Sequence, residues 1–197
     1  MLKKLTLLTL SSVAAFAMHT AEININDSDL ELGAKLDMGQ FYDTVEPDTV
    51  FVGFKFLNAD DKHSENDKAG IKPYYEVNFL MQRDIGDKGM SIGLGMKLNY
   101  TKAAKSDFMS IPLGAEFGYK IPASDLIPMS VHGSLYYAPS VLSFSDADSF
   151  LEYRLSYDIE VIPNGNITLG YRRIDTNYEA ADFKYNSSWF AGFKFGF

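Results

Sequence analysis

The sequence contains no cysteine, so no disulfide framework holds the protein together. It also lacks any long apolar run after the first 21 residues, because charged residues or glycines interrupt every such segment. A membrane-spanning helix would need about 20 consecutive apolar residues, and no segment shows convincing helical periodicity. Basic residues are few, since 18 Lys and Arg stand against 26 Asp and Glu, a formal net charge of −8. Because phosphate binding needs clustered Lys and Arg, nucleic acid is not an expected partner.

The N-terminus has the three parts of a secretory signal peptide. Two lysines near the start form a short basic region, and an apolar stretch runs from Leu5 to Phe16. A small-x-small pattern ends at Ala17, which predicts cleavage after that residue, with cleavage after Ala21 as the alternative. We therefore expect a cleaved signal peptide at residues 1–17 and a single exported domain at residues 18–197.

From residue 30 onward, apolar and polar residues alternate with a period of two. In the segment that begins at Met90, for example, Met, Ile, Leu and Tyr alternate with Ser, Gly, Lys and Asn. This pattern is typical of strands with two different faces, and each run is long enough for the roughly 9–11 residues that cross a bilayer at a tilt. The pattern predicts nine strands, near residues 30–42, 49–58, 71–83, 89–101, 108–120, 128–139, 150–161, 166–176 and 188–197.

A short tenth strand is expected before these nine. The segment from Glu22 to Asn26 alternates as well, and the following Asp27 to Asp29 can turn it into the next strand. Bacterial single-chain barrels have an even number of strands. The sequence therefore predicts an all-β fold, a transmembrane antiparallel up-and-down β-barrel of about ten strands, with eight as the alternative if two weak segments lie outside the wall.

Glycine placement indicates which face of each strand points outward. Alternation alone also fits a soluble barrel with an apolar interior. Nearly all strand glycines lie on the charged face, with Gly133 as an exception, and a narrow barrel interior has room for small residues mixed with a few long ones. The charged face also carries both signs, which suits an interior whose side chains neutralise one another. We therefore predict an apolar exterior and a lumen charge network of Glu31, Lys35, Asp37, Lys55, Glu76, Lys97, Glu116, Lys120, Glu152, Arg154, Asp158, Glu160, Arg172 and Lys194.

The final strand carries an aromatic face. Trp189, Phe193, Phe195 and Phe197 share that face, while glycines and a lysine occupy the other. A chain that ends on an aromatic residue in this pattern fits the closing strand of a transmembrane barrel, and we predict that these four residues form the signal read by the barrel-assembly machinery. Interfacial aromatic girdles are expected to include Tyr100, Tyr119, Tyr136, Tyr137, Tyr171 and Trp189.

Long and short connections alternate along the chain. The long polar ones cover residues 59–70, 139–149 and 177–187, and the short ones cover residues 84–88, 121–128 and 163–165. Long loops of bacterial barrels face outward and short turns face the periplasm. We therefore expect the C-terminus in the periplasm and the long loops outside the cell.

One motif permits a catalytic interpretation. His132 and Ser134 have the spacing of a base and a nucleophile on one strand face, and Glu116 or Glu152 could orient the imidazole. Some outer-membrane lipid A deacylases are barrels that use these residue types. Here the alternation aims His132 into the interior, close to a periplasmic turn and away from lipid A in the outer leaflet. We therefore predict no catalytic residue and no enzymatic activity, with a lipid A-modifying hydrolase as a less favoured alternative.

The longest acidic loop, residues 59–70, includes His63 among aspartates and a glutamate. A divalent cation could bind there, but the spacing matches no ordered ligand pattern such as a calcium loop. A solvated acidic loop is the better interpretation. The sequence therefore predicts no metal ion and no cofactor.

Several stretches resemble the YfaZ family of bacterial outer-membrane proteins. They are the segment from Tyr136 to Pro139 with the following Leu142-Ser143, the segment from Gly170 to Asp175, and the aromatic C-terminal strand. The resemblance implies a small exported barrel and brings no established reaction, cofactor or catalytic residue. It supports no function for the acidic loop or for the His-x-Ser pair.

The combined expectation is a small integral protein of the outer membrane of a Gram-negative bacterium. We predict a monomeric barrel whose interior is largely closed by paired charges, with a structural or surface-interaction role. A narrow passive pore for ions or small solutes is the alternative. The expected partners are outer-membrane lipid, lipopolysaccharide and the barrel-assembly machinery.

Overall fold

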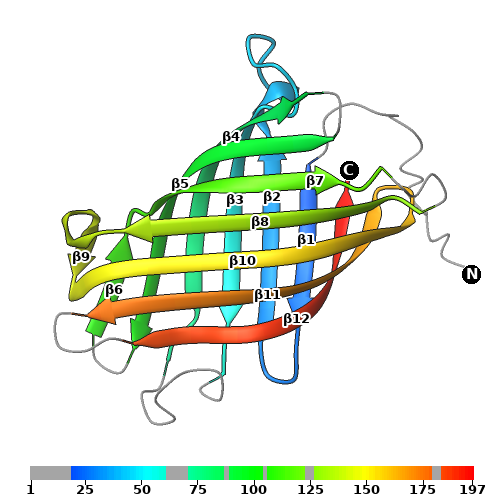
Figure 1. The fold of residues 1–197 in the computed structure, drawn as a ribbon. Coiled ribbons are helices and arrows are strands. Elements are labelled where there is room, and N and C mark those ends of the chain that lie inside the picture. Colours follow the sequence, from blue (N-terminus) through cyan, green and yellow to red (C-terminus); the bar gives the residue numbers. More distant parts are fainter. Residues whose placement is uncertain (1–18, 61–70, 87–88, 104–105, 123–126, 179–182) are drawn as a thin grey trace, which may run out of the picture.

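The computed structural model describes residues 19–60, 71–86, 89–103, 106–122, 127–178 and 183–197, and its strands form one closed antiparallel barrel (Figure 1). The expected signal peptide and most of the acidic loop with His63 lie outside these residues. Within the described ranges, no helix is long and apolar enough to cross a membrane.

The long strands pair with their neighbours along the chain, the short β6 and β9 extend two of them, and the last strand pairs with the first. In β1, Thr20 pairs with Gly196 of β12 and Ile25 pairs with Ala191, so the blue and red strands of Figure 1 close the wall. The strands are β1 (Thr20–Ile25), β2 (Leu30–Asp37), β3 (Val50–Asn58), β4 (Tyr74–Ile85), β5 (Met90–Ala103), β6 (Ser106–Ser110), β7 (Leu113–Lys120), β8 (Met129–Ala138), β9 (Ser143–Ser145), β10 (Ala147–Ile162), β11 (Gly165–Tyr178) and β12 (Lys184–Gly196). Two short 3-10 helices, η1 (Met38–Gln40) and η3 (Ser140–Leu142), lie in connections.

The prediction of ten wall strands is confirmed. Two of the ten are interrupted by proline, which has no N–H to donate to a ladder. The predicted strand 108–120 is divided into β6 and β7 at Ile111-Pro112, and β5 pairs with both parts. The predicted strand 128–139 ends before Pro139 as β8, which pairs with β7. After η3, the short β9 continues the wall by pairing with β6.

The short first strand has the turn that the sequence predicts. The Asn26 side-chain oxygen accepts hydrogen bonds from the N–H groups of Ser28 (2.9 Å) and Asp29 (2.6 Å). An asparagine that bonds its own backbone in this way mimics a backbone turn. The turn brings β2 alongside β1, with Ile25 opposite Leu30.

The apolar face of the wall points outward. Leu94 is 69% exposed and Trp189 is 74% exposed. Glycines on the opposite face make room for inward side chains from neighbouring strands: a Cβ added at Gly95 or Gly114 would collide with Tyr136. Gly133, a strand glycine that does not lie on the charged face, differs: a Cβ added there would have no other atom within 4 Å.

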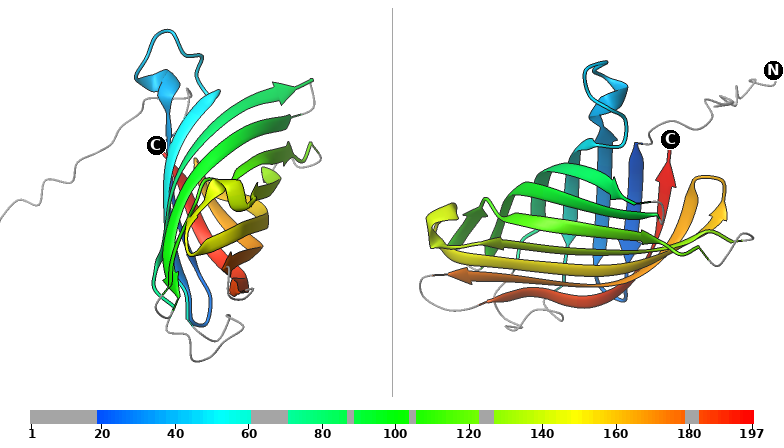
Figure 2. Two further views of the ribbon diagram at one scale, coloured as in Figure 1. Left: turned by 90° about the vertical axis from the view of Figure 1, so that its left-hand side faces the viewer. Right: turned by 45° about the horizontal axis from the view of Figure 1, so that its top comes forward.

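The two ends of the barrel differ. The terminus end carries the start of β1 and the end of β12, while the loop end carries the β3–β4, β8–β10 and β11–β12 connections. The alternation of long and short connections has an exception, because the β2–β3 connection at the terminus end runs from residue 38 to 49 and projects beyond the strands (Figure 2). The Asp37 carboxylate organises this connection by accepting bonds from the N–H groups of Gly39 and Asp48, both at 3.0 Å.

Candidate functional site

The interior is layered from the loop end to the terminus end, and an apolar cluster forms the first layer. Tyr74 and Phe150 stack with ring centroids 6.4 Å apart, and Tyr185 lies 5.8 Å from Tyr74. All three side chains are fully buried. The whole cluster contains Leu57, Tyr74, Phe108, Ala138, Ala147, Phe150, Ile174, Phe183 and Tyr185. This cluster was not predicted from the sequence, which indicated an interior largely closed by paired charges.

A ring of two lysines and two glutamates lies directly beneath this cluster. Lys55 Nζ is 3.0 Å from Glu152 and 3.4 Å from Glu76. Lys97 Nζ is 2.6 Å from Glu152 and 3.3 Å from Glu76. Each glutamate therefore bridges both lysines, and all four residues are buried. Burying a charge is costly unless it is paired and hydrogen-bonded, and the ring meets both conditions because the Tyr74 hydroxyl also donates to Glu76 (3.0 Å).

A second ionic group lies beside the ring, where β1 turns into β2. Arg172 donates to Glu31 (3.1 Å) and to Asp29 (3.0 Å), and Arg154 donates to Glu31 (2.6 Å). The Phe190 ring lies 4.4 Å from the Arg154 guanidinium carbon and 5.5 Å from that of Arg172. Both guanidiniums thus make cation–π contacts with the same ring.

Asp29 is the member of this group that lies in the β1–β2 turn. Burial opposes its ionisation, but hydrogen bonds from Asn26, from Asn186 and from the N–H of Asp60, together with the charge of Arg172, lower its pKa from 3.8 to about 2. A carboxylate with a depressed pKa stabilises the fold above its unfolded pKa. The contribution of Asp29 is therefore lost as the pH falls from about 4 towards 2.

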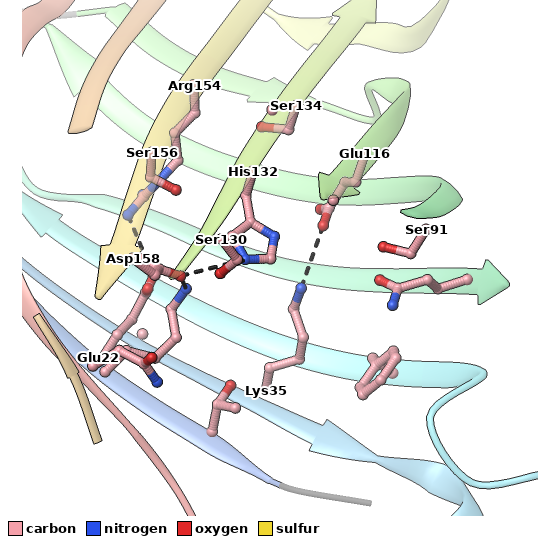
Figure 3. A pocket seen from close by; sticks show the side chains of 18 of the residues that line it. Glu22, Lys35, Ser91, Glu116, Ser130, His132, Ser134, Arg154, Ser156 and Asp158 are labelled. Atoms are coloured by element: carbon pink, nitrogen blue, oxygen red, sulfur yellow. Dashed lines mark hydrogen bonds and ion pairs between the residues drawn. The ribbon is translucent and has the colours of Figure 1, made fainter. Parts of the chain in front are cut away.

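The third layer is a cavity of about 750 Å³, which we call the vestibule. Its lining extends from the buried Lys55, Glu76 and Lys97 to the strand ends at the terminus end, where Lys120 and Pro128 lie. Lys35 pairs with Glu116 across the vestibule (3.3 Å), as Figure 3 shows. The vestibule thus opens at the terminus end and ends blindly against the ion-pair ring.

The His-x-Ser pair lines the vestibule, but the contacts of His132 are not those of a catalytic relay. Its Nε2 lies 3.1 Å from Ser130 Oγ, and the same nitrogen lies 3.4 Å from Asp158 Oδ2. A relay needs the nucleophile on one ring nitrogen and the orienting carboxylate on the other. Ser134 stands opposite Glu116 and Arg154 on the neighbouring strands, without a hydrogen bond to His132 (Figure 3).

Eleven of the fourteen residues predicted for the lumen form ion pairs with inward-facing partners. The other three lie at the terminus end: Asp37 caps the β2–β3 connection, Glu160 accepts from the N–H of Asn164 (3.1 Å), and Lys120 stands exposed at the rim.

Sequence reasoning missed other interior residues. Asp29 and Glu22 pair with the interior arginines, and both stand outside the long alternating runs. Tyr136 was placed in an aromatic girdle, which is wrong, because it is buried, donates to Glu116 (2.8 Å) and lies over Lys97 (3.9 Å to the ring centroid). It has the same parity as His132 and Ser134, and that signal could have placed it inside. Tyr137, by contrast, is 52% exposed on the outer face.

The family model described as YfaZ precursor matches residues 5–197, nearly the whole chain. The chain is a member of the YfaZ precursor family. The resemblance to the YfaZ family is thereby confirmed. No curated protein matches the sequence.

Two solved structures are similar to this YfaZ-family barrel. The outer membrane channel DcaP of Acinetobacter baumannii shares 8% identity and a TM-score of 0.38 over 89% of this chain. The chain spans about half the length of that channel, 54%. A structure described as "Unveiling the Mechanism Behind the in-meso Crystallization of Membrane Proteins" shares 11% identity and a TM-score of 0.38, with 91% of this chain and 83% of that chain covered.

Proposed function

We propose that this protein is an integral outer-membrane barrel of a Gram-negative bacterium, with a lumen closed by paired charges and a structural or surface-interaction role. The observation that carries the proposal is the Lys55–Glu76–Lys97–Glu152 ring, in which both glutamates bridge both lysines. The apolar cluster lies against it on the loop side. Together these layers support a barrel that separates the two sides of the membrane.

The proposed orientation places the loop end outside the cell and the terminus end in the periplasm. The connections at the loop end support it, because the β3–β4 and β8–β10 connections are long, whereas the β10–β11 turn at the terminus end is short, and long loops of bacterial barrels face outward while short turns face the periplasm. The lipid-facing surface would then contact outer-membrane lipid and lipopolysaccharide, and the outward aromatic face of β12 would be read by the barrel-assembly machinery. The proposed role is that of a monomer without enzymatic activity.

A narrow passive pore is the second candidate, and the vestibule favours it. Because the cavity already extends from the terminus end to the ring, a continuous path needs only the ring and the apolar cluster to separate. Opening would require both layers to rearrange, and breaking a buried ion pair costs about 3–5 kcal/mol. The closed scaffold is therefore the better supported of the two functions.

Single-channel recording in a planar lipid bilayer tests the choice. The expected result is no discrete conductance from folded wild-type protein, with insertion checked by heat-modifiable migration of the same sample. The variant Tyr74→Gly/Phe150→Gly/Lys97→Ala/Glu152→Ala, which removes two large side chains from the apolar cluster and one lysine and one glutamate from the ring, serves as the open control. Discrete wild-type steps would reject the closed scaffold and support the pore. In parallel, the mass of lipid A from cells that express the protein is expected not to change, and a change abolished by Ser134→Ala would support the hydrolase instead.

A further inference from the structure

The vestibule has a chemistry of its own that the scaffold role does not use. We propose that it is a binding site for a neutral, polyhydroxylated solute of disaccharide size, entered from the terminus end. The proposal rests on its volume, its charge balance and its free hydroxyl groups, and it goes beyond the proposed function.

Volume and polarity set the first limits. About 750 Å³ lies within the roughly 300–1,000 Å³ range of small-molecule sites. Such sites are usually mostly apolar with few polar groups, whereas twelve ionisable Lys, Arg, Asp and Glu residues line this one. An apolar ligand would strip water from these groups without replacing its hydrogen bonds. The occupant must therefore be polar.

The charges of the lining exclude a strongly charged occupant. Six cationic and six anionic side chains line the vestibule, so its formal charge is zero. Ion pairs are observed for nine of these twelve side chains in the described part of the chain; Lys194, for example, lies 2.6 Å from Asp158, and Lys35 lies 3.3 Å from Glu116. An anion or cation would have to displace one partner of such a pair. A solute without net charge leaves the pairs intact.

Free hydroxyl groups then indicate the class of solute. Ser91, Ser134 and Ser156 point into the vestibule from three different strands (Figure 3). None of the three hydroxyls bonds to another residue in the described part of the chain, and Ser156 is only 6% exposed. A hydroxyl group both donates and accepts, and the amides of Asn78, Gln82 and Asn166 add the same capacity. Sugars and polyols present the same mixture of donors and acceptors.

Titration of trehalose against the full-length folded barrel, followed by saturation-transfer-difference NMR, tests the proposal. The detergent must have no sugar headgroup, and a polyoxyethylene detergent meets this condition. We expect saturable transfer to trehalose, with no saturable signal from diglycine or citrate. The variant Ser134→Ala/Ser156→Ala is expected to weaken the binding about tenfold, because two hydrogen bonds are lost. The control Ser187→Ala removes a hydroxyl bonded to the outward-facing Tyr171 and is expected to bind as the wild type does.

Three results would overturn the proposal. The first is the absence of a saturable trehalose signal from wild-type protein that migrates as folded. The second is stronger binding of diglycine or citrate than of trehalose. The third is equal trehalose affinity in the double serine variant and the wild type. Since the measurement is independent of conductance, a conducting barrel that binds trehalose would reject the closed scaffold and leave the binding site intact.

Discussion

Glu152→Gln removes one negative charge from the buried ring and leaves the shape of the side chain almost unchanged. In the wild type, Glu152 accepts from Lys97 at 2.6 Å and from Lys55 at 3.0 Å. After the substitution, both ammonium groups depend on Glu76, at 3.3 and 3.4 Å. Two positive charges then share one carboxylate in a buried layer, and the excess charge is not neutralised.

The expected loss of stability follows from these contacts. A hydrogen bond to a charged group contributes about 1.5–3 kcal/mol, and the variant weakens two of them. Removing one partner of a buried ion pair costs about 3–5 kcal/mol, so the two estimates agree. We therefore expect the free energy of unfolding to fall by about 3–5 kcal/mol. With a urea dependence of about 2 kcal/mol per molar, the midpoint should move down by about 2 M.

Urea unfolding of the barrel in lipid vesicles, followed by heat-modifiable migration and far-UV circular dichroism, measures this change. Glu160→Gln is the matched control, because its carboxylate accepts a single exposed backbone hydrogen bond, and a change within about 0.5 kcal/mol is expected. Adding Lys97→Met to Glu152→Gln rebalances the layer and should restore part of the loss. If Glu152→Gln and Glu160→Gln shifted the midpoint equally, the reasoning would be refuted, and water rather than ion pairing would stabilise the interior charges.

Three further predictions concern the wall and its seam. Gly95→Ala should lower the free energy of unfolding by about 1–3 kcal/mol, because the new methyl group collides with Tyr136. Gly133→Ala should leave the midpoint of urea unfolding nearly unchanged. Equal effects of the two substitutions would contradict the packing of Tyr136 over the glycines. Deleting Phe197 should lower the heat-modifiable fraction, because its N–H donates to the His19 carbonyl (2.9 Å) and its ring contacts His19; unchanged assembly would count against the terminal signal. Intact-mass measurement of the exported chain should place its first residue at Met18, since Thr20 and Ala21 pair with Gly196 and Phe195; a chain beginning at Glu22 would show cleavage after Ala21 instead.

The architecture could be predicted from the sequence because alternation is a local property of each strand. The period of two identified the wall strands, and the positions of glycine relative to lysine and glutamate identified the inward face, as Gly95 and Lys97 show on β5. The aromatic end of the chain identified the closing strand, where Trp189 stands outward. None of these signals requires knowledge of contacts between distant residues.

The layering of the interior could not be predicted in the same way. Tyr74 and Phe150 are inward-facing aromatics on strands 76 residues apart in the sequence, and only closure of the barrel brings them together. The partners of each charge depend on strand register and side-chain length, so the bridging of both lysines by Glu152 was not visible. The alternation along β8 alone would have placed Tyr136 in the interior, on the same face as His132 and Ser134. The neighbouring Tyr137, which faces outward, instead suggested an aromatic girdle.

The orientation of the two strand faces is the central claim, and the native absence of cysteine makes it directly measurable. Single spin labels at Leu94 and at Ser134, in protein reconstituted into lipid vesicles, report collision rates with apolar oxygen and with a water-soluble nickel chelate. Leu94 stands on the exposed outer face, and Ser134 lines the vestibule. The label at position 94 should collide mainly with oxygen, and the label at position 134 should collide mainly with the nickel chelate. The reverse pattern, with the leucine face in water and the serine face in hydrocarbon, would contradict the account.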